Sequence, residues 1–397
     1  MLSIFNAALV TLAVVLFVPA LVYTIECLVA AMPRSSRPVS PGGERPAVAV
    51  LVPAHNEAGT IGETVAHIAT QLSSDDRLIV IADNCTDETA AEATGAGAEA
   101  WIRTDEKRRG KGYAISFAIS RLREDPPPVV VLIDADCRLG EGLIDRIATA
   151  AMKKNRPVQS RYLFDAPPGS GRMSEISAFA CLVRNHVRPL GMQRLGFPCH
   201  LTGSGMAFRW DQIANAPEQG GNIVEDLSLG LEMAIAGSEP MLCEDAIIRS
   251  DLPVSGQAAK TQRQRWEHGQ MATLVTFVPR LLRQAVAQRR FSLCALALDL
   301  VVPPLAFLVL LNVAAAVINA GAGLLLGLYS ALGISLVSLF LIALATMAAW
   351  IRFGRDTVSG RTLLSTPVYV LWKLPLYVAA VIGKRQKDWV RTDRNSG

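Results

Sequence analysis

Two carboxylates one residue apart, Asp134 and Asp136, follow a run of five apolar residues, 129–133. Like charges this close repel one another unless a cation lies between them. A hard divalent cation such as Mg²⁺ or Mn²⁺ binds carboxylate oxygens, and substrate phosphates usually complete its coordination. The pair therefore predicts a metal site, and a solvated acidic turn is the alternative interpretation.

Three further side chains can bind parts of a nucleotide. Asp83 follows the apolar run 78–82 directly and can accept a hydrogen bond from a ribose hydroxyl or a base N–H, although a turn Asp is common. Glu57 can bond a nucleoside or cap the helix that follows it. Lys111 lies in the loop KRRGKG, which can bind phosphate or be a solvated basic loop.

The acidic pair Glu225–Asp226 precedes an apolar helical stretch. A carboxylate at this position can act as a general base on an acceptor hydroxyl, with Asp226 the favoured residue. The alternative is a helix N-terminus whose dipole favours negative charge. The small residues of TGSG, 202–205, either form the floor of a pocket or make a plain hairpin.

A third motif, Gln262-x-x-Arg265-Trp266, lies within about one helical turn. Arg265 can clamp a diphosphate with two parallel hydrogen bonds. Trp266 offers a flat face on which a sugar ring can stack. The alternative is a set of basic and aromatic residues at a membrane surface, which is common.

The elements that would position these groups alternate between strand and helix. Apolar runs at 47–53, 78–82 and 129–133 read as buried strands, with a helix over 57–72 and a short edge strand at 101–102. Continuous apolar strands separated by helices predict an α/β fold with a mostly parallel sheet. Because ligands bind at the carboxyl ends of such strands, Asp83 and Asp134 should share one rim of the sheet.

Composition separates this chain from an ordinary soluble enzyme. Of its 397 residues 51% are hydrophobic, and the net charge of +4 gives no case for nucleic acid as a partner. The mean hydropathy is +0.31. The seven cysteines are scattered without a CxxC pair, so we expect a reduced cytosolic setting rather than a disulfide scaffold or a zinc site.

Long apolar stretches predict membrane segments at both ends. Residues 2–32 predict a transmembrane helix, and the basic residues after it place the N-terminus outside. Residues 292–318 and 323–350 are each long enough to span. The stretch 363–383 is interrupted by Pro and Lys, so we expect an interfacial or re-entrant segment there.

The predicted organisation has four parts. An N-terminal transmembrane helix occupies residues 1–33, and a cytosolic catalytic domain occupies 34–255. Interfacial amphipathic helices that carry the Gln-Arg-Trp motif follow over 256–291. A membrane region with two spans and an interfacial segment completes the chain over 292–397.

The ordered set Asp83, Asp134-x-Asp136, Glu225-Asp226 and Gln262-x-x-Arg265-Trp266 resembles the inverting family 2 glycosyltransferases. The nearest resemblance is to the membrane-integrated branch with cellulose, chitin, hyaluronan and poly-N-acetylglucosamine synthases, and it covers about residues 47–290. Each motif alone is weak, but their common order and spacing is specific. Two positions differ from the usual pattern, Val224 in place of Thr and His55 in place of an aromatic residue.

The resemblance implies a GT-A-type nucleotide-sugar-binding domain, flanked by N- and C-terminal transmembrane helices, in a multi-pass protein of the inner (plasma) membrane with its catalytic domain in the cytoplasm. It also implies roles for the residues above. Glu57 and Asp83 would contact the uridine of a UDP-sugar. Asp134 would lie near the nucleotide, and Asp136 would ligate the Mg²⁺ or Mn²⁺ that bridges the diphosphate. Asp226 would be the catalytic base next to Glu225, and Gln262, Arg265 and Trp266 would hold the diphosphate and the acceptor sugar.

The implied reaction is a single displacement that gives a β-linked product and builds an exopolysaccharide or related surface glycan. Expected partners are a UDP-sugar, a glycan or lipid-linked acceptor, membrane lipids, and polysaccharide assembly proteins or further copies of the chain. Two alternatives stay open: transfer of one sugar to a lipid-linked acceptor, and a non-catalytic membrane subunit of a glycan secretion complex.

Overall fold

The computed structural model describes residues 1–33, 45–217, 225–253 and 256–366, without the side chains of 256–265 and 268. These residues form two compact units. The sheet unit takes residues 45–167, 198–217, 225–253 and 256–269, and the helical unit takes 1–33, 168–197 and 270–366.

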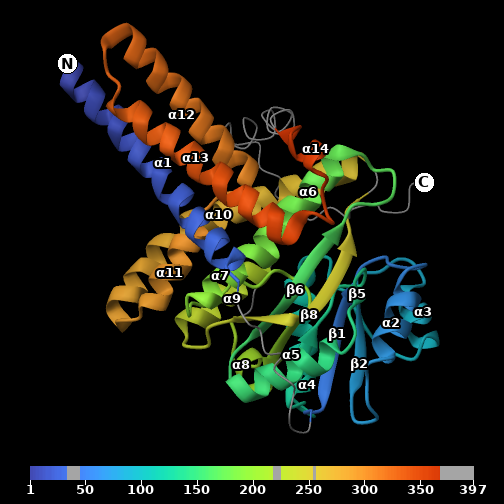
Figure 1. Cartoon of the computed structure of the whole chain (residues 1–397). Helices are drawn as coiled ribbons and strands as arrows, with labels where there is room; N and C mark the ends of the chain where they lie inside the picture. Colours follow the sequence, from blue (N-terminus) through green and yellow to red (C-terminus); the bar gives the residue numbers. More distant parts are fainter. Residues whose placement is uncertain (34–44, 218–224, 254–255, 367–397) are drawn as a thin grey trace. The chain divides into compact units, whose positions relative to one another are not determined.

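The sheet unit is built around eight strands in the order β3-β2-β1-β4-β7-β6-β8-β5 within the described residues (Figure 1). The strands are β1 Val48–Ala54, β2 Arg77–Asp83, β3 Glu99–Arg103, β4 Val129–Leu132, β5 Arg138–Leu139, β6 Val158–Asp165, β7 Met206–Arg209 and β8 Met241–Asp251. The pairs β1–β2, β1–β4, β2–β3 and β6–β8 are parallel. The pairs β4–β7, β5–β8 and β6–β7 are antiparallel.

The predicted strands and the mostly parallel sheet are confirmed. The runs at 47–53, 78–82 and 129–133 form β1, β2 and β4, and the edge strand at 101–102 lies in β3. All four residues of β4 are buried, which explains why its sequence is continuously apolar rather than alternating. Asp83 ends β2 and Asp134 follows β4, and both strands run parallel to β1 between them, so the two residues lie at one rim.

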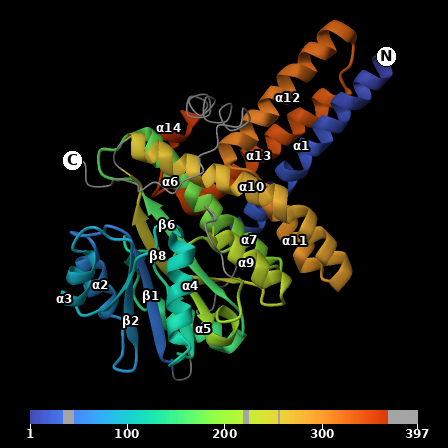
Figure 2. The same ribbon diagram turned by 180° about the vertical axis from the view of Figure 1, so that it is seen from behind.

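Helices cover the sheet, and two of them, α4 and α9, begin with candidate site residues. They are α2 Ile61–Ala69, α3 Thr89–Gly95, α4 Lys111–Leu122, α5 Leu143–Lys154, α8 Trp210–Ile213 and α9 Glu225–Ile235. Side chains of α4 and α9, such as Ala118 and Leu229, share one core cluster with Leu51 and Leu132 of the sheet. In Figure 2, α4 runs beside β1. This packing fixes the first residues of both helices relative to the strand ends.

The helical unit contains the segments that can cross a membrane. Its elements are α1 Leu2–Ala31, α6 Arg172–Leu182, the π-helical turn η1 Val183–Val187, α7 Arg188–Arg194, α11 Phe291–Leu300, α12 Leu305–Leu326, α13 Ser330–Ala349, η2 Trp350–Gly354 and α14 Gly360–Leu363. The long helix α10 Gly256–Gln288 belongs to it from residue 270 onward. Among the described residues, three helices are long and apolar enough to span: Leu2–Ala31, Leu305–Leu326 and Ser330–Gly354.

Both C-terminal spans differ from the predicted ranges. A span over 292–318 is wrong, because the helix breaks at Pro303 and Pro304 and leaves the short helix α11 before α12. The following helix ends at Leu326 with Gly327 in the left-handed conformation, so α13 begins at Ser330 rather than at 323. Most of the predicted interfacial segment, 363–383, lies outside the described residues.

A buried ionic cluster joins three helices of this unit. The Nε atom of Arg188 donates to Glu26 of α1 at 2.6 Å, and its Nη2 atom bonds the carboxylate of Asp299 in α11. Arg194, two turns along α7, donates to the terminal carbonyls of α1, at 2.6 Å from Ala30 O. Asp299 therefore has a buried cationic partner inside the helical unit.

Candidate active site

The predicted metal ligands lie in the turn that follows β4. One ligand atom each from Asp134, Asp136 and Cys137 lies within 4.8 Å of the other two. Burial raises the pKa of the Cys137 thiol to about 12, so the thiol is protonated at neutral pH. The remaining donors are two carboxylates, which fit Mg²⁺ or Mn²⁺ better than a thiophilic metal.

Two buried serines hold this turn. The backbone N–H of Asp134 donates to Ser204 Oγ at 3.0 Å, and Ser250 Oγ donates to Asp136 Oδ2 at 2.6 Å. Both serines have 0% exposure. Ser204 lies in the TGSG segment that the sequence singled out, although its bond to Asp134 was not predicted. Sequence reasoning missed Ser250, because nothing in a lone serine 114 residues away indicates that it meets this turn.

Lys111, the first residue of α4, is the cation nearest to these carboxylates among the described contacts. Its Nζ atom bonds the carboxylate of Asp134 and donates to the carbonyl of Gly203 at 2.6 Å. Burial opposes the charge, but the carboxylates of Asp134, Glu225 and Asp226 outweigh it and raise the pKa of Lys111 to about 12. The interpretation of KRRGKG as only a solvated basic loop therefore does not apply to Lys111.

The acidic pair begins α9. Glu225 and Asp226 are in its first turn, where the helix dipole favours negative charge. Burial and the neighbouring charge of Asp226 raise the pKa of Glu225 to about 7. Asp226 lies against Gly203, since a Cβ atom at position 203 would be 3.2 Å from Asp226 Oδ2.

A cavity of about 470 Å³ lies between Lys111 and the acidic pair at the start of α9. Lys111, Glu225 and Asp226 line it, together with apolar residues that include Leu132 and Leu229. The small residues at 202–205 thus contribute to the site, because the Gly203 carbonyl contacts Lys111 and Ser204 holds Asp134. Residues predicted from four separate motifs are therefore brought together around one loop.

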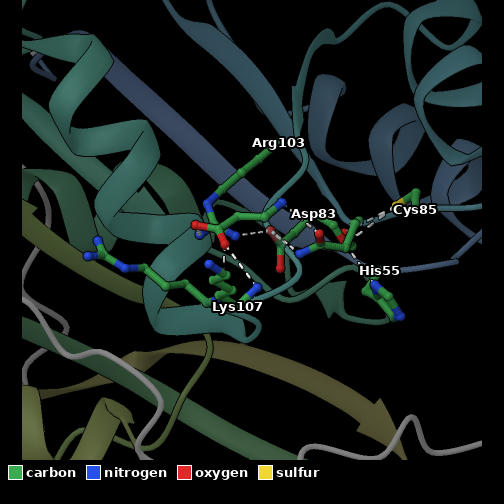
Figure 3. Close-up of polar contacts among 9 residues, drawn as sticks. His55, Asp83, Cys85, Arg103 and Lys107 are labelled. Carbon is green, nitrogen blue, oxygen red and sulfur yellow. Dashed lines mark hydrogen bonds and ion pairs between the residues drawn. The ribbon is translucent and has the colours of Figure 1, made fainter.

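Asp83 occupies the rim as predicted, but with a partner that the sequence did not reveal. Its Oδ1 atom accepts from Arg103 Nη1 at 2.5 Å and from Asn84 Nδ2 at 3.1 Å (Figure 3). The parallel register of β2 and β3 pairs Asp83 with Arg103 directly. His55, which stands in place of an aromatic residue, bonds the backbone carbonyl of Asp83 through Nδ1 at 2.7 Å.

Glu57 lies in the loop after β1 rather than in a helix. The capping interpretation is wrong, because α2 begins at Ile61 and its N-cap is Thr60 without a side-chain cap bond. Thr60 Oγ1 donates to Glu57 Oε2 at 3.2 Å, and the Glu57 backbone N–H donates to Thr89 Oγ1 at 2.8 Å. These bonds fix the loop near the rim. The nucleoside contact of Glu57 stays a prediction.

Trp266 is the part of the Gln-Arg-Trp motif whose side chain is described. Its ring centroid lies 5.2 Å from that of Phe164, which in turn lies 4.5 Å from that of Tyr162. The backbone of Gln262 and Arg265 lies in α10, but their side chains lie outside the described part of the chain, as does Val224. The diphosphate clamp thus stays a prediction.

Comparison with known proteins identifies the family. The sequence model described as "Glycosyltransferase like family 2" matches residues 46–269. The chain is a family 2 glycosyltransferase. No curated protein sequence matches this glycosyltransferase.

Two solved structures are similar to this glycosyltransferase to different degrees. The mannosyltransferase PcManGT from Pyrobaculum calidifontis, in complex with GDP-Man and Mn²⁺, is 18% identical, and the match covers 95% of this glycosyltransferase and 100% of that chain with a TM-score of 0.52. Glucosyl-3-phosphoglycerate synthase from Mycobacterium tuberculosis, in complex with Mg²⁺ and UDP, is 22% identical with a TM-score of 0.36, over 52% and 70% of the two chains. The sheet unit of the glycosyltransferase has a GT-A-like fold.

Proposed function

We propose that this glycosyltransferase is a membrane-bound inverting enzyme that transfers a sugar from a nucleotide-sugar, a UDP-sugar in the first instance, to a hydroxyl of a surface glycan or its precursor. The observation that carries the proposal is the position of Lys111. Its ammonium group bonds Asp134 of the predicted metal pair and the Gly203 carbonyl, beside Asp226 of the predicted base pair. Metal ligands and base would thus act on one substrate.

The proposed reaction is a single displacement. Asp226 accepts the proton of the acceptor hydroxyl. At the same time the hydroxyl oxygen of the acceptor forms a bond to the anomeric carbon, and the bond from that carbon to the nucleoside diphosphate breaks. The ammonium of Lys111 offsets negative charge on the departing diphosphate. A divalent cation held by Asp134 and Asp136 supplies further positive charge to the diphosphate when it is bound. Attack opposite to the leaving group turns an α-linked donor into a β-linked product.

Two proposals concern the acceptor. The family resemblance supports synthesis of an exopolysaccharide by the membrane-integrated branch, at the inner membrane with the sheet unit in the cytoplasm. Transfer of one sugar to a lipid-linked acceptor is the second candidate. It is supported by the three candidate spans among the described residues, which are few for a polymer channel, and by the whole-chain likeness to a mannosyltransferase bound to GDP-Man.

Product analysis tests both proposals. The full chain in nanodiscs is incubated with Mn²⁺, a panel of radiolabelled UDP- and GDP-sugars, and membrane lipid extract as the acceptor source. A short product that partitions into organic solvent supports single addition, whereas a long ladder supports a processive synthase. The Asp226→Asn variant is the control, because it should bind the nucleotide normally and turn over at least about a hundredfold more slowly. Normal turnover by this variant would remove the base assignment.

A further inference from the structure

Ser250 lies behind the predicted metal ligand Asp136. It is on β8, opposite Phe164 in the parallel register with β6, and has 0% exposure. Its hydroxyl donates to Asp136 Oδ2 at 2.6 Å across 114 residues of sequence. A neutral buried donor therefore meets one oxygen of a carboxylate that should face a cation.

A second hydroxyl supports this contact. The phenol of Tyr162 is buried and hydrogen-bonds with Ser250. The Cys137 sulfur lies 3.8 Å from the Tyr162 hydroxyl, 3.2 Å from Ser204 Oγ and 3.8 Å from Asp136 Oδ1. Because the single proton of Ser250 goes to Asp136, the Ser250 oxygen is left to accept from Tyr162. Tyr162 and Ser250 thus form a line of two donors that ends at the Asp136 carboxylate.

This line of donors is not needed to hold the strands together. Residues Arg138 and Leu139 of β5 already pair with β8. The guanidinium of Arg138 also makes two bonds to Asp251, at 2.6 and 2.7 Å. The turn and β8 are thus joined next to Ser250 by other contacts, and the hydroxyl of Ser250 acts on the carboxylate itself.

We propose that Ser250, with Tyr162 behind it, is a positioning residue that fixes the orientation of the Asp136 carboxylate for divalent-cation binding; this inference rests on the proposed metal-dependent function. A carboxylate rotates about its side-chain bonds, and each free rotation that binding must stop costs affinity. Groups that hydrogen-bond to metal ligands from behind typically contribute tenfold to a hundredfold in metal affinity.

The test measures Mn²⁺ affinity without turnover. Mn²⁺ is added in steps to the full chain in nanodiscs, without a nucleotide-sugar. The EPR signal of free Mn²⁺ then gives the fraction that is bound. Ser250→Ala should weaken Mn²⁺ binding by about tenfold to a hundredfold, and Tyr162→Phe should weaken it by a smaller factor. The matched control is Ser160→Ala on β6, which also has 0% exposure and whose Oγ atom makes no hydrogen bond within the described part of the chain. Its affinity should equal that of the wild type.

The outcomes separate this inference from the proposed function. The Asp136→Asn variant shows the Mn²⁺ affinity that remains when a predicted metal ligand is removed. Unchanged Mn²⁺ affinity in Ser250→Ala and Tyr162→Phe, with loss in Asp136→Asn, would overturn the positioning role and leave the metal site intact. Unchanged affinity in Asp136→Asn would overturn the metal assignment and this inference with it. If Ser250→Ala does not fold, Tyr162→Phe decides alone, because it keeps the aromatic ring and its packing on Phe164.

Discussion

Gly203 lies so close to Asp226 that no side chain fits between them without movement. A Cβ atom at position 203 would be 3.2 Å from Asp226 Oδ2 and 3.8 Å from Lys111 Nζ. The backbone of Gly203 also has φ +107°, a conformation that residues with a side chain rarely adopt. The loop therefore needs glycine both for its backbone and for its contact with the predicted base.

Gly203→Ala should reduce turnover by about tenfold or more, because even a small displacement of a reacting group is costly. It should also lower the free energy of unfolding by about 1 kcal/mol or more through backbone strain. Steady-state kinetics and thermal unfolding measure the two effects. Gly97→Ala is the matched control, since Gly97 has φ +102° and no atom within 4 Å of its Cβ position. Equal turnover in the two variants would contradict the contact with Asp226.

Replacement of Lys111 should separate donor binding from metal binding. Lys111→Met leaves Asp134, Glu225 and Asp226 without the cation that interacts with all three. The cluster should then repel a nucleoside diphosphate, and its affinity should fall by about tenfold to a hundredfold. Calorimetric titration with UDP and GDP measures this loss, and Mn²⁺ affinity alone should not fall.

The control for this variant is Lys107→Met. Lys107 is exposed in the same loop, and its backbone N–H rather than its ammonium group bonds Asp105. Nucleotide affinity should stay at the wild-type value. If Lys111→Met and Lys107→Met lose nucleotide affinity equally, the loop acts through its net charge. The contacts of Lys111 with the acidic cluster would then not contribute to nucleotide binding.

The sequence predicted the strands of this fold better than it predicted the ends of the helices. Continuous apolar runs such as 129–133 have one simple explanation, a strand buried on both faces, and the carboxylates at their ends follow from parallel topology. The predicted ends of the C-terminal helices differ from the observed ends. Two adjacent prolines split the predicted span at 292–318, and hydropathy alone does not register them.

The supporting contacts of the site could not be predicted from the sequence. Arg103, Ser204 and Ser250 reach Asp83, Asp134 and Asp136 only because particular strands become neighbours. A polar residue that is buried by tertiary structure looks the same in the sequence as one that faces water. Two of the three had a partial signal. Ser204 lies in the small-residue segment 202–205, and Arg103 lies in β3, which follows β2 and pairs with it in parallel register.

The raised pKa of Glu225 predicts that stability depends on pH. The ordinary value of 4.5 is raised to about 7 in the folded state, first by burial and then by the charge of Asp226. Between these values Glu225 binds more protons in the folded chain than in the unfolded chain. Its contribution to stability is therefore largest below pH 4.5 and falls as pH rises towards 7. The slope from this group is at most about 1.4 kcal/mol per pH unit.

Thermal unfolding of the metal-free chain at pH 5, 6 and 8 measures this dependence, with Glu225→Gln as the comparison. Because glutamine does not titrate, the variant should lose less stability than the wild type over this range. Glu232→Gln, a partly buried position on the same helix, should keep the wild-type pH dependence. Identical pH profiles for wild type and Glu225→Gln would contradict the assignment.

Arg188 should be essential for the stability of the helical unit. Its guanidinium is the cation between two buried carboxylates, Glu26 of α1 and Asp299 of α11. Arg188→Met removes the cation and leaves both carboxylates buried, which typically costs about 3–5 kcal/mol. Thermal unfolding in nanodiscs should show a large decrease in the transition temperature.

Two further variants make this prediction specific. Arg172→Met removes an exposed arginine from the neighbouring helix α6 and should change the free energy of unfolding by less than about 0.5 kcal/mol. The triple variant Arg188→Met, Glu26→Gln, Asp299→Asn removes the buried charges together and should be more stable than Arg188→Met alone, because an unpaired buried charge costs more than a neutral amide. If the triple variant is no more stable than Arg188→Met, packing of the arginine side chain rather than charge pairing stabilises the three-helix contact.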